Sequence, residues 1–191
     1  FKNSRIKNSQ NKYNIGLTKN INKMVSEAEG VFCIILGQDD ILLNKHIEES
    51  IKEFEKEEIV LVHCNANYID EHGRDLNMYA RENNKQNFKN NNPLNFLAFD
   101  NYIQSCGMIF RKKAFLDVGG WEEKYPNLGE WLIHIKMAKY GKFGYCDKTF
   151  SYYRKHPSSL IKKLNNEKIF HLFLYHTRCR YLAFKYAKLN L

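Results

Sequence analysis

The sequence has few of the features that divide a chain into parts or anchor it in a membrane. It contains three prolines, no Gly/Ser-rich linker and no internal repeat, so its 191 residues are expected to form one domain. No apolar run approaches the roughly twenty residues that cross a bilayer, and no signal peptide opens the chain. The first residue is Phe1 rather than Met, which indicates a fragment of a longer protein.

Paired cysteines are also lacking, which excludes a zinc framework of the usual spacing. The five cysteines are widely scattered, without a CxxC pair: Cys33, Cys64, Cys106, Cys146 and Cys179. An odd number of cysteines with apolar neighbours is typical of reduced, packed thiols in a cytosolic protein. No nucleic-acid recognition motif is present either.

Positive charge is abundant. Thirty Lys and Arg stand against 21 Asp and Glu, a formal net charge of +9. Such an excess favours polyanionic partners, namely nucleic acid, anionic lipid or phosphorylated substrates, but a solvated surface in an Asn- and Lys-rich chain explains it equally well. Hydrophobic residues make up 43% of the chain and aromatic residues 14%, enough to build a core and to exclude intrinsic disorder.

The hydrophobic pattern of the first half predicts alternating helices and strands. Helical spacing runs from Asn14 to Glu29, and a continuous apolar run from Val31 to Leu36 predicts a strand buried on both faces. Asn44 is a candidate N-cap for a second helix, which ends near Glu58, and Ile59 to Cys64 predicts the next buried strand. A strand, a helix and a second strand in this order indicate a parallel crossover and an α/β sheet.

The second half continues with the same types of element. Arg74 to Asn92 is polar and is predicted to be a mobile loop. The remaining expected elements are a short helix at Pro93 to Phe99, a strand at Gln104 to Arg111, a helix at Trp131 to Tyr140, a strand at Tyr145 to Tyr153 and a long helix at Glu167 to Ala187.

Two adjacent carboxylates, Asp39 and Asp40, follow the first predicted strand. Ligands of open α/β sheets bind at the carboxyl ends of the strands. Adjacent carboxylates repel each other unless a cation, a proton or a helix N-terminus lies between them, and Mg²⁺ or Mn²⁺ takes oxygen ligands of this kind. The pair therefore indicates a divalent metal site, although turn and capping residues before the next helix would look the same.

Short segments around this pair match, in order and spacing, a pattern of the form N-x-G, RN, A-x-G and DxDD. The matching segments are Asn14 to Gly16, Lys19-Asn20, Ala28 to Gly30 and Gln38 to Asp40. Later segments match the elements GG-F, ED-W with R-x-x-x-x-G, and YR-x-H with a following S. These are Gly119 to Trp121, Glu130-Trp131 with Lys136, Tyr140 and Gly141, and Tyr153 to His156 with Ser158-Ser159. The chain thereby resembles family-2 glycosyltransferases of the GT-A fold.

This resemblance implies a single GT-A-like, nucleotide-diphospho-sugar transferase domain. We expect an α/β core at 1–160, with a mostly parallel central sheet flanked by helices, and a basic amphipathic helix at 161–191 packed on it. The strand that opens such domains, and a second strand with a base-reading aspartate, would precede Asn14, and no segment of this sequence corresponds to them. Without them the base pocket would be incomplete, which bears on whether this polypeptide is active alone.

The resemblance also assigns roles to individual residues. Asp40 and His156 are expected to hold a divalent metal, Mn²⁺ or Mg²⁺, and Asp39, Asn14 and Asn20 to bind the donor. His156 could instead be a solvated side chain, and Asn20 a residue of the helix surface.

Glu130 matches the position of the catalytic base. As base it would deprotonate the acceptor hydroxyl, although a first-turn glutamate stabilised by the helix dipole is the alternative. Gly37 and Gly129 replace acidic residues of the family pattern.

The expected function is that of an inverting hexosyltransferase that moves a sugar from a nucleotide-diphosphate donor to a bacterial capsule or cell-wall polysaccharide, or to a lipid-linked acceptor. We expect the protein in the cytoplasm, at the inner face of the membrane in one interpretation, and without a nucleic-acid partner. A catalytically degenerate binding module is the alternative, favoured by Gly37, Gly129 and the missing strands.

The basic segment from Lys162 to Lys188 allows two interpretations. Its Lys, Arg and His residues alternate with Phe, Tyr and Leu. It could lie on anionic membrane, or it could pack on the domain with its basic face in water.

Overall fold

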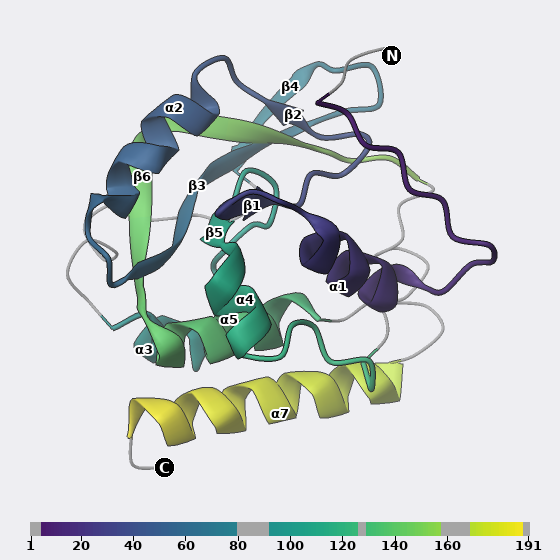
Figure 1. Cartoon of the computed structure of the whole chain (residues 1–191). Helices are drawn as coiled ribbons and strands as arrows, with labels where there is room; N and C mark the ends of the chain where they lie inside the picture. Colours follow the sequence, from purple (N-terminus) through teal and green to yellow (C-terminus); the bar gives the residue numbers. More distant parts are fainter. Residues whose placement is uncertain (1–4, 80–91, 126–128, 158–168, 189–191) are drawn as a thin grey trace.

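The computed structural model describes residues 5–79, 92–125, 129–157 and 169–188 (Figure 1). Its helices are α1 (Leu17–Glu27), α2 (His46–Ile51), the 3₁₀ helix η1 (Lys52–Glu55), α3 (Pro93–Leu97), α4 (Lys112–Asp117), α5 (Glu130–Tyr140) and α7 (Ile169–Ala187). Its strands are β1 (Phe32–Ile34), β2 (Ile41–Leu42), β3 (Ile59–Ile69), β4 (Asp75–Tyr79), β5 (Ile109–Arg111) and β6 (Lys142–Arg154). The α/β class expected from the sequence is confirmed.

The six strands form one mixed sheet in the order β1-β5-β3-β6-β2, with β4 added beside β3. The pairing of β3 with β6 is parallel, and the other pairings described are antiparallel. The expectation of a mostly parallel sheet is therefore wrong for the described strands. The first crossover does bring β3 parallel to β1, but β5 inserts between them and runs against both. Sequence order alone could not reveal this insertion.

The sheet separates two layers of helices, because neighbouring residues of each strand point to opposite faces. Leu61 and Phe110 pair across β3 and β5 and pack with the core residues of α1, α4 and α5. The next pair, Val62 and Ile109, packs on the other face with Phe54 of η1. The sheet is thus covered by α2 and η1 on one side and by α1, α4 and α5 on the other (Figure 1).

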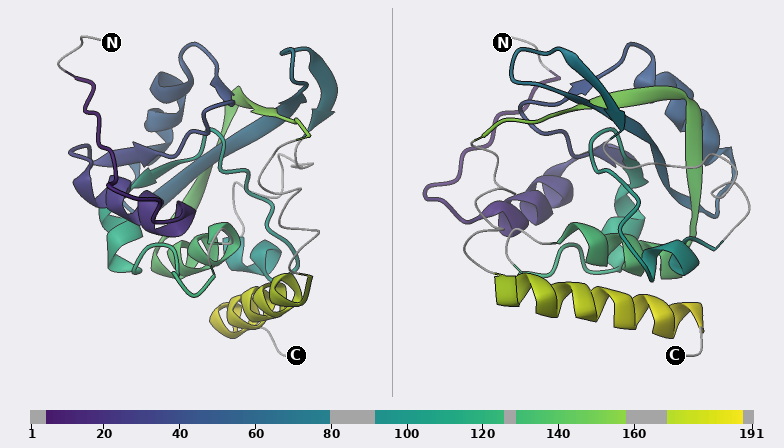
Figure 2. Two further views of the ribbon diagram at one scale, coloured as in Figure 1. Left: turned by 90° about the vertical axis from the view of Figure 1, so that its right-hand side faces the viewer. Right: turned by 180° about the vertical axis from the view of Figure 1, so that it is seen from behind.

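Helix α7 forms an outer layer beyond α3 and α5 (Figure 2). Its inner face buries Tyr175, Cys179 and Ala183 against a cluster that includes Trp131 and Leu132 of α5. The Tyr175 hydroxyl accepts a hydrogen bond from the Leu132 N–H at 3.1 Å. The expected boundary between 160 and 161 lies outside the described residues. Within the described part of the chain, no helix is both long enough and apolar enough to cross a membrane.

Three local expectations were wrong. The segment predicted as a loop, Arg74 to Asn92, contains β4, which pairs with the far end of β3, while residues 80–91 lie outside the described part. The strand expected at Val31 to Leu36 is short and half-buried, because β1 is the last strand of the described sheet on its side. Asn44 does not cap α2, whose N-cap position is occupied by Lys45 with a φ of 66°.

Candidate functional site

The acidic pair lies in the connection from β1 to β2, beside the carboxyl end of β6. Strand β2 begins directly after Asp40, and its antiparallel pairing of Ile41 with Tyr152 fixes the pair next to the last residues of β6. The parallel neighbour β3 ends at the same edge of the sheet, where Ile69 pairs with Arg154. The acidic residues thus occupy the edge at which ligands of α/β sheets bind.

Arg154, the last residue of β6, forms hydrogen bonds with both the acidic loop and the end of β3 at this edge. Its backbone N–H donates to the Asp40 carboxylate at 3.1 Å. Its side chain donates from Nε to the Asp39 carbonyl oxygen at 3.0 Å and from Nη1 to the Asp70 carbonyl oxygen at 2.8 Å. A planar guanidinium can satisfy several acceptors at once, and Arg154 therefore fixes the acidic turn against the end of β3.

His156 reaches the acidic pair two residues later, and its partner is Asp39. The imidazole Nε2 lies 2.9 Å from Asp39 Oδ2, with both side chains partly exposed. The sequence resemblance had joined His156 with Asp40 as metal ligands. The contact of His156 described here is with Asp39, and metal binding by His156 and Asp40 stays a prediction.

Asp40 is the more buried member of the pair. Burial raises the pKa of its carboxyl, the Arg154 backbone N–H opposes this by lowering it, and the negative charge of Asp39 raises it again. A nearby cation would offset both the burial and the repulsion. The ionised carboxyl of Asp40 is therefore disfavoured on its own and would be stabilised by a bound cation.

The turn before β5 adds a further influence on Asp40. The Cys106 thiol donates to the Tyr152 carbonyl oxygen at 3.3 Å, and its interaction with the Asp40 carboxyl lowers the pKa of that carboxyl. Burial raises the pKa of this thiol to about 12, so it stays protonated and can act as a donor. The Ser151 hydroxyl donates to the Cys106 carbonyl at 2.7 Å, and His46 Nε2 lies 2.7 Å from the Gly107 carbonyl.

Glu130 is the first residue of α5, and its carboxylate is held by Ser105, the residue before Cys106 in the turn that precedes β5. Both the backbone N–H of Ser105, at 3.2 Å, and the Ser105 hydroxyl donate to Glu130 Oε1. Ser105 and Cys106 thus connect Glu130 to Asp40 through two adjacent residues. The same carboxylates act on Tyr153: burial first, and then the charges of Asp40, Glu130 and Asp39, raise the pKa of its hydroxyl to about 12.

Both glycines that replace acidic residues of the family pattern fit their surroundings closely. A Cβ at Gly37 would lie 2.7 Å from Asp40 Oδ2 and 3.1 Å from Asp39 Oδ1. A Cβ at Gly129 would overlap the ring of Trp121. The acidic pair and the tryptophan occupy the space that the missing side chains would need, so the two departures are accommodated by the packing.

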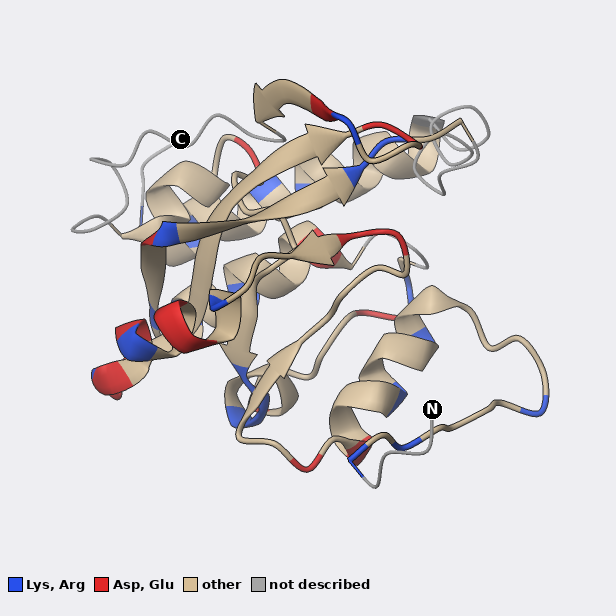
Figure 3. Cartoon of the chain, turned by 90° about the horizontal axis from the view of Figure 1, so that it is seen from above, with Lys and Arg blue, Asp and Glu red and all other residues tan. Residues whose placement is uncertain are grey.

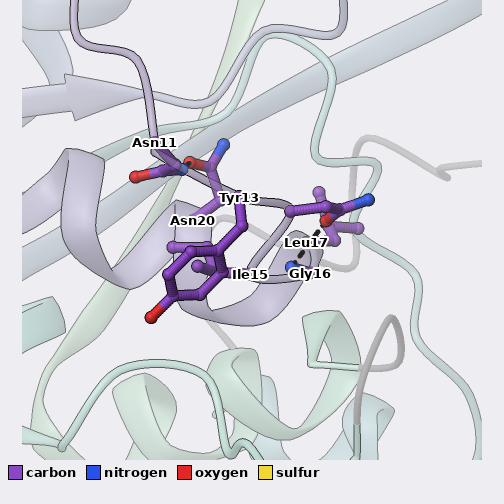
Figure 4. Close-up of a pocket in the computed structure, with 7 residues that line it drawn as sticks. Asn11, Tyr13, Ile15, Gly16, Leu17 and Asn20 are labelled. Carbon is purple, nitrogen blue, oxygen red and sulfur yellow. Dashed lines mark hydrogen bonds between the residues drawn. The ribbon is translucent and has the colours of Figure 1, made fainter.

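Asn14 and Asn20 lie in a different part of the structure. With Asn11, Tyr13 and Gly16 they line a hollow of about 430 Å³ at the start of α1 (Figure 4). Asn14 Oδ1 accepts a hydrogen bond from the Gly16 N–H at 2.9 Å, and Asn20 Oδ1 accepts one from Asn11 at 2.8 Å. These contacts organise the N-terminal segment, and donor binding by the two asparagines stays a prediction.

The residues near the acidic pair fit a divalent cation in part. Asp39, Asp40 and His156 supply oxygen and nitrogen donors of the kind that Mn²⁺ and Mg²⁺ accept. Among the residues that the structure describes, no group of three or more His, Cys, Asp or Glu is gathered closely enough to hold a metal. The protein side of such a site would be two or three ligands, and diphosphate oxygens and water would complete it.

Solved structures of a bacterial protein, S. aureus TarS, have a similar fold. The crystal structure of S. aureus TarS 1-349 in complex with UDP-GlcNAc matches with a TM-score of 0.55 and 16% identity, over 75% of this chain and 40% of that one. The complex of TarS 1-349 with UDP matches with a TM-score of 0.53 and 18% identity, over 74% and 41%. This chain therefore spans about two fifths of the length of TarS 1-349, and identities this low show the fold alone.

The sequence itself matches one family model over more than half of its length. The model is that of glycosyl transferase family 2, and the match covers residues 2–118, which include Asp39, Asp40 and Ser105. No curated protein sequence matches this chain. The matched stretch, the α/β fold and the similarity to TarS agree with one another, and the chain belongs to glycosyl transferase family 2.

Proposed function

We propose that this chain forms the catalytic core of an inverting glycosyltransferase, in which Glu130 is the base and the acidic pair lies at the donor diphosphate. The observation that carries the proposal is the turn at Ser105 and Cys106. Ser105 donates two hydrogen bonds to Glu130, and Cys106 donates to the Tyr152 carbonyl oxygen, beside the β2 strand that follows Asp40. In such an enzyme the base and the diphosphate site must lie on opposite sides of the same sugar carbon, within a short distance of each other. The adjacent residues Ser105 and Cys106 connect two parts of the structure at such a short separation.

The donor in this proposal is a nucleotide-diphosphate sugar, with a uridine nucleotide as the first candidate. Two of the structures with a similar fold hold UDP-GlcNAc and UDP. In this chain, Arg154 would keep the acidic turn in place, and Asp39 and His156 would face the diphosphate. Asn14 and Asn20 would contact the donor only from the N-terminal side, through the hollow they line.

A divalent cation belongs to this proposal as Mn²⁺ or Mg²⁺ held by Asp40 and one of its two neighbours, Asp39 or His156, with diphosphate oxygens and water as the other ligands. When bound, it would neutralise the charge that grows on the leaving nucleoside diphosphate. The environment of Asp40 supports this assignment, because burial and the charge of Asp39 both raise the pKa of its carboxyl and a cation would offset both.

Glu130 would accept the proton of the acceptor hydroxyl while that oxygen attacks the anomeric carbon from the side opposite the diphosphate. The bond from carbon to the diphosphate oxygen breaks as the new glycosidic bond forms, so the configuration inverts. Ser105 donates to Oε1 of Glu130 and thereby fixes the rotation of the carboxylate. Glu130 lies in the first turn of α5, where the positive end of the helix dipole faces the carboxylate.

The acceptor in this proposal is a surface polysaccharide of a bacterium or a lipid-linked saccharide, glycosylated from the cytoplasmic side. Nucleic acid stays outside the proposal. Acidic and basic residues are interspersed over the ribbon in the view of Figure 3, whereas a nucleic-acid groove would show a continuous basic stripe.

A catalytically degenerate binding module is the second candidate, because Gly129 stands where the family pattern has an acid. Two measurements on the full chain separate the candidates. Thermal melting with UDP-sugars and Mn²⁺ reports donor binding, and release of UDP reports transfer or hydrolysis. A rise in melting temperature together with UDP release supports the enzyme, a rise without release supports the module, and neither with any nucleotide sugar contradicts both.

A further inference from the structure

The outward face of α7 carries an apolar stripe that no described residue covers. Phe170, Phe173, Leu174 and Tyr181 are 69%, 64%, 44% and 55% exposed. Their spacing places them on one side of the helix, opposite the buried Tyr175, Cys179 and Ala183. Exposed aromatic residues that gather on a single face, rather than being scattered singly, indicate an interaction surface.

Phe99 extends this stripe beyond the helix. It follows α3, is 66% exposed, and its ring packs edge-on against Phe184 of α7 with the centroids 5.7 Å apart. Arg180 donates from Nε to the Phe99 carbonyl oxygen at 3.2 Å, which fixes this residue beside the helix. The apolar surface is therefore held in place by both elements and is not the loose end of a helix.

Positive charge borders the stripe, and negative charge is lacking on the helix. No Asp or Glu occurs from Ile169 to Lys188. At 100° per residue, Lys185 and Arg180 lie on the two flanks of the stripe and Lys188 lies at its end, all three exposed. An apolar centre between cationic edges matches the headgroup region of a bilayer that contains anionic lipid.

The position of α7 in the fold makes this face accessible. The helix lies along one outer side of the molecule in all views, with α3 and α5 between it and the sheet (Figures 1 and 2). The sequence allowed either packing on the core or contact with a membrane. The structure reconciles the two interpretations, because one face of α7 packs while the opposite face is exposed.

We propose that α7 and Phe99 form a membrane-docking surface, on which the protein lies with the helix axis parallel to an anionic lipid bilayer. A second copy of the chain is a poorer occupant. A symmetric contact through this face would bring the two cationic borders together without an acidic residue of α7 to offset them. The proposal goes beyond the transfer reaction and does not depend on it.

Co-sedimentation of the full chain with vesicles tests the docking surface. Vesicles of phosphatidylcholine with about a third phosphatidylglycerol should bind the protein at least tenfold better than pure phosphatidylcholine. Binding should weaken as salt is raised, because exposed charges are screened within about 10 Å at 0.1 M salt. The variant Phe173→Ser/Tyr181→Ser should lose most of the binding, and Lys185→Glu/Lys188→Glu should lose the preference for anionic lipid.

Matched controls keep the result interpretable. Tyr13, which is 73% exposed at the other end of the chain, provides Tyr13→Ser as the aromatic control, and Lys45→Glu controls for charge. Unchanged melting temperatures show that the variants fold. Failure of the parent to bind anionic vesicles, or equal binding by Phe173→Ser/Tyr181→Ser, overturns the proposal. A dimer in light scattering that this variant abolishes would assign the face to a second copy instead.

Discussion

Ser105 donates its backbone N–H and its hydroxyl to the same carboxylate oxygen of Glu130. The next residue, Cys106, donates its thiol to the Tyr152 carbonyl oxygen, and Tyr152 pairs with Ile41, the residue that follows Asp40. Residues that are 25 positions apart, such as Ser105 and Glu130, meet here because the turn before β5 lies between the start of α5 and the acidic loop. This turn is what makes a base and a diphosphate site neighbours in the proposed enzyme.

Glu130→Gln removes the proposed base while keeping an oxygen for Ser105. We expect the turnover number to fall by roughly 10²–10⁴, the usual contribution of a positioned base, with donor binding unchanged. Steady-state rates of UDP release measure the first quantity, and calorimetric titration with the donor measures the second.

Glu48→Gln is the matched control, because Glu48 also lies in the first turn of a helix and is exposed. Its rate should equal that of the parent. Full activity in Glu130→Gln would mean that another group accepts the proton.

Ser105→Ala deletes one of the two donors to Glu130 and leaves the backbone N–H. Loss of a hydrogen bond to a charged group is expected to weaken the positioning of the carboxylate by about 1–2 kcal/mol, which corresponds to a roughly tenfold slower turnover. The KM for the donor should not change, because Ser105 does not contact the donor in this account. If the role of Ser105 were purely structural, Ser105→Ala would lower the melting temperature and leave the rate per folded molecule unchanged. In the proposed role, Ser105→Thr should restore part of the rate, because threonine keeps the hydroxyl.

Asp40→Asn should stabilise the protein at neutral pH while abolishing transfer. The pKa of the Asp40 carboxyl is raised in the folded state, so folding favours the protonated form. The stability that the protonated carboxyl contributes is lost as the pH rises through that pKa. Asparagine retains an acceptor for the Arg154 N–H without the charge. The free energy of unfolding in EDTA should rise by up to about 1 kcal/mol at pH 7.5, a small gain because the carboxyl is only half-buried.

The sign of the pH dependence provides the check on this prediction. As the pH falls towards about 4, the ordinary pKa of aspartate, the parent carboxyl becomes protonated and the advantage of Asp40→Asn should vanish. An advantage that is constant with pH, or that grows in acid, would show that the charge of Asp40 is not its source. Urea unfolding at a series of pH values measures it.

Arg154→Lys keeps a positive charge and loses the fork of donors. The contacts to the Asp39 and Asp70 carbonyl oxygens cannot both be made by an ammonium in the same geometry. We expect the free energy of unfolding to fall by about 1–2 kcal/mol and the KM for the donor to rise several-fold, because the acidic loop is released from the end of β3. Arg74→Lys is the control, since Arg74 forms an exposed ion pair with Asp70 at the same edge. An equal effect of both variants would show that the loss does not come from the contacts of Arg154 with the Asp39 and Asp70 carbonyl oxygens.

Much of the fold could be predicted from local pattern. The helical spacing that predicted α7 and most of α1 is present because one face of each helix is buried in the core. Helix α5 is instead buried on two faces, against the sheet core and against α7. The direction of β1 relative to β3 also followed from the sequence. The position of β5 between them did not, because a strand of three residues near the middle of the chain carries no signal for its neighbours.

The site was predicted in part for a similar reason. Asp39, Asp40, Glu130 and His156 were identified through short motifs, and the structure places the first three around Tyr153 and joins His156 to Asp39. Ser105 and Cys106 were not identified, because nothing in their sequence neighbourhood distinguishes them from ordinary strand-end residues. Arg154 lay within a quoted motif, but its three contacts depend on β3, β6 and the acidic loop meeting in space.

The most direct test of the account is a crystal structure of the full chain with Mn²⁺ and a nucleoside diphosphate sugar. The account predicts an anomalous manganese peak at the carboxylates of Asp39 and Asp40, with the anomeric carbon of the sugar between that peak and Glu130. A donor bound without contact to Asp39 or Asp40, for example in the hollow lined by Asn14 and Asn20 alone, or a sugar that faces away from Glu130, would contradict it.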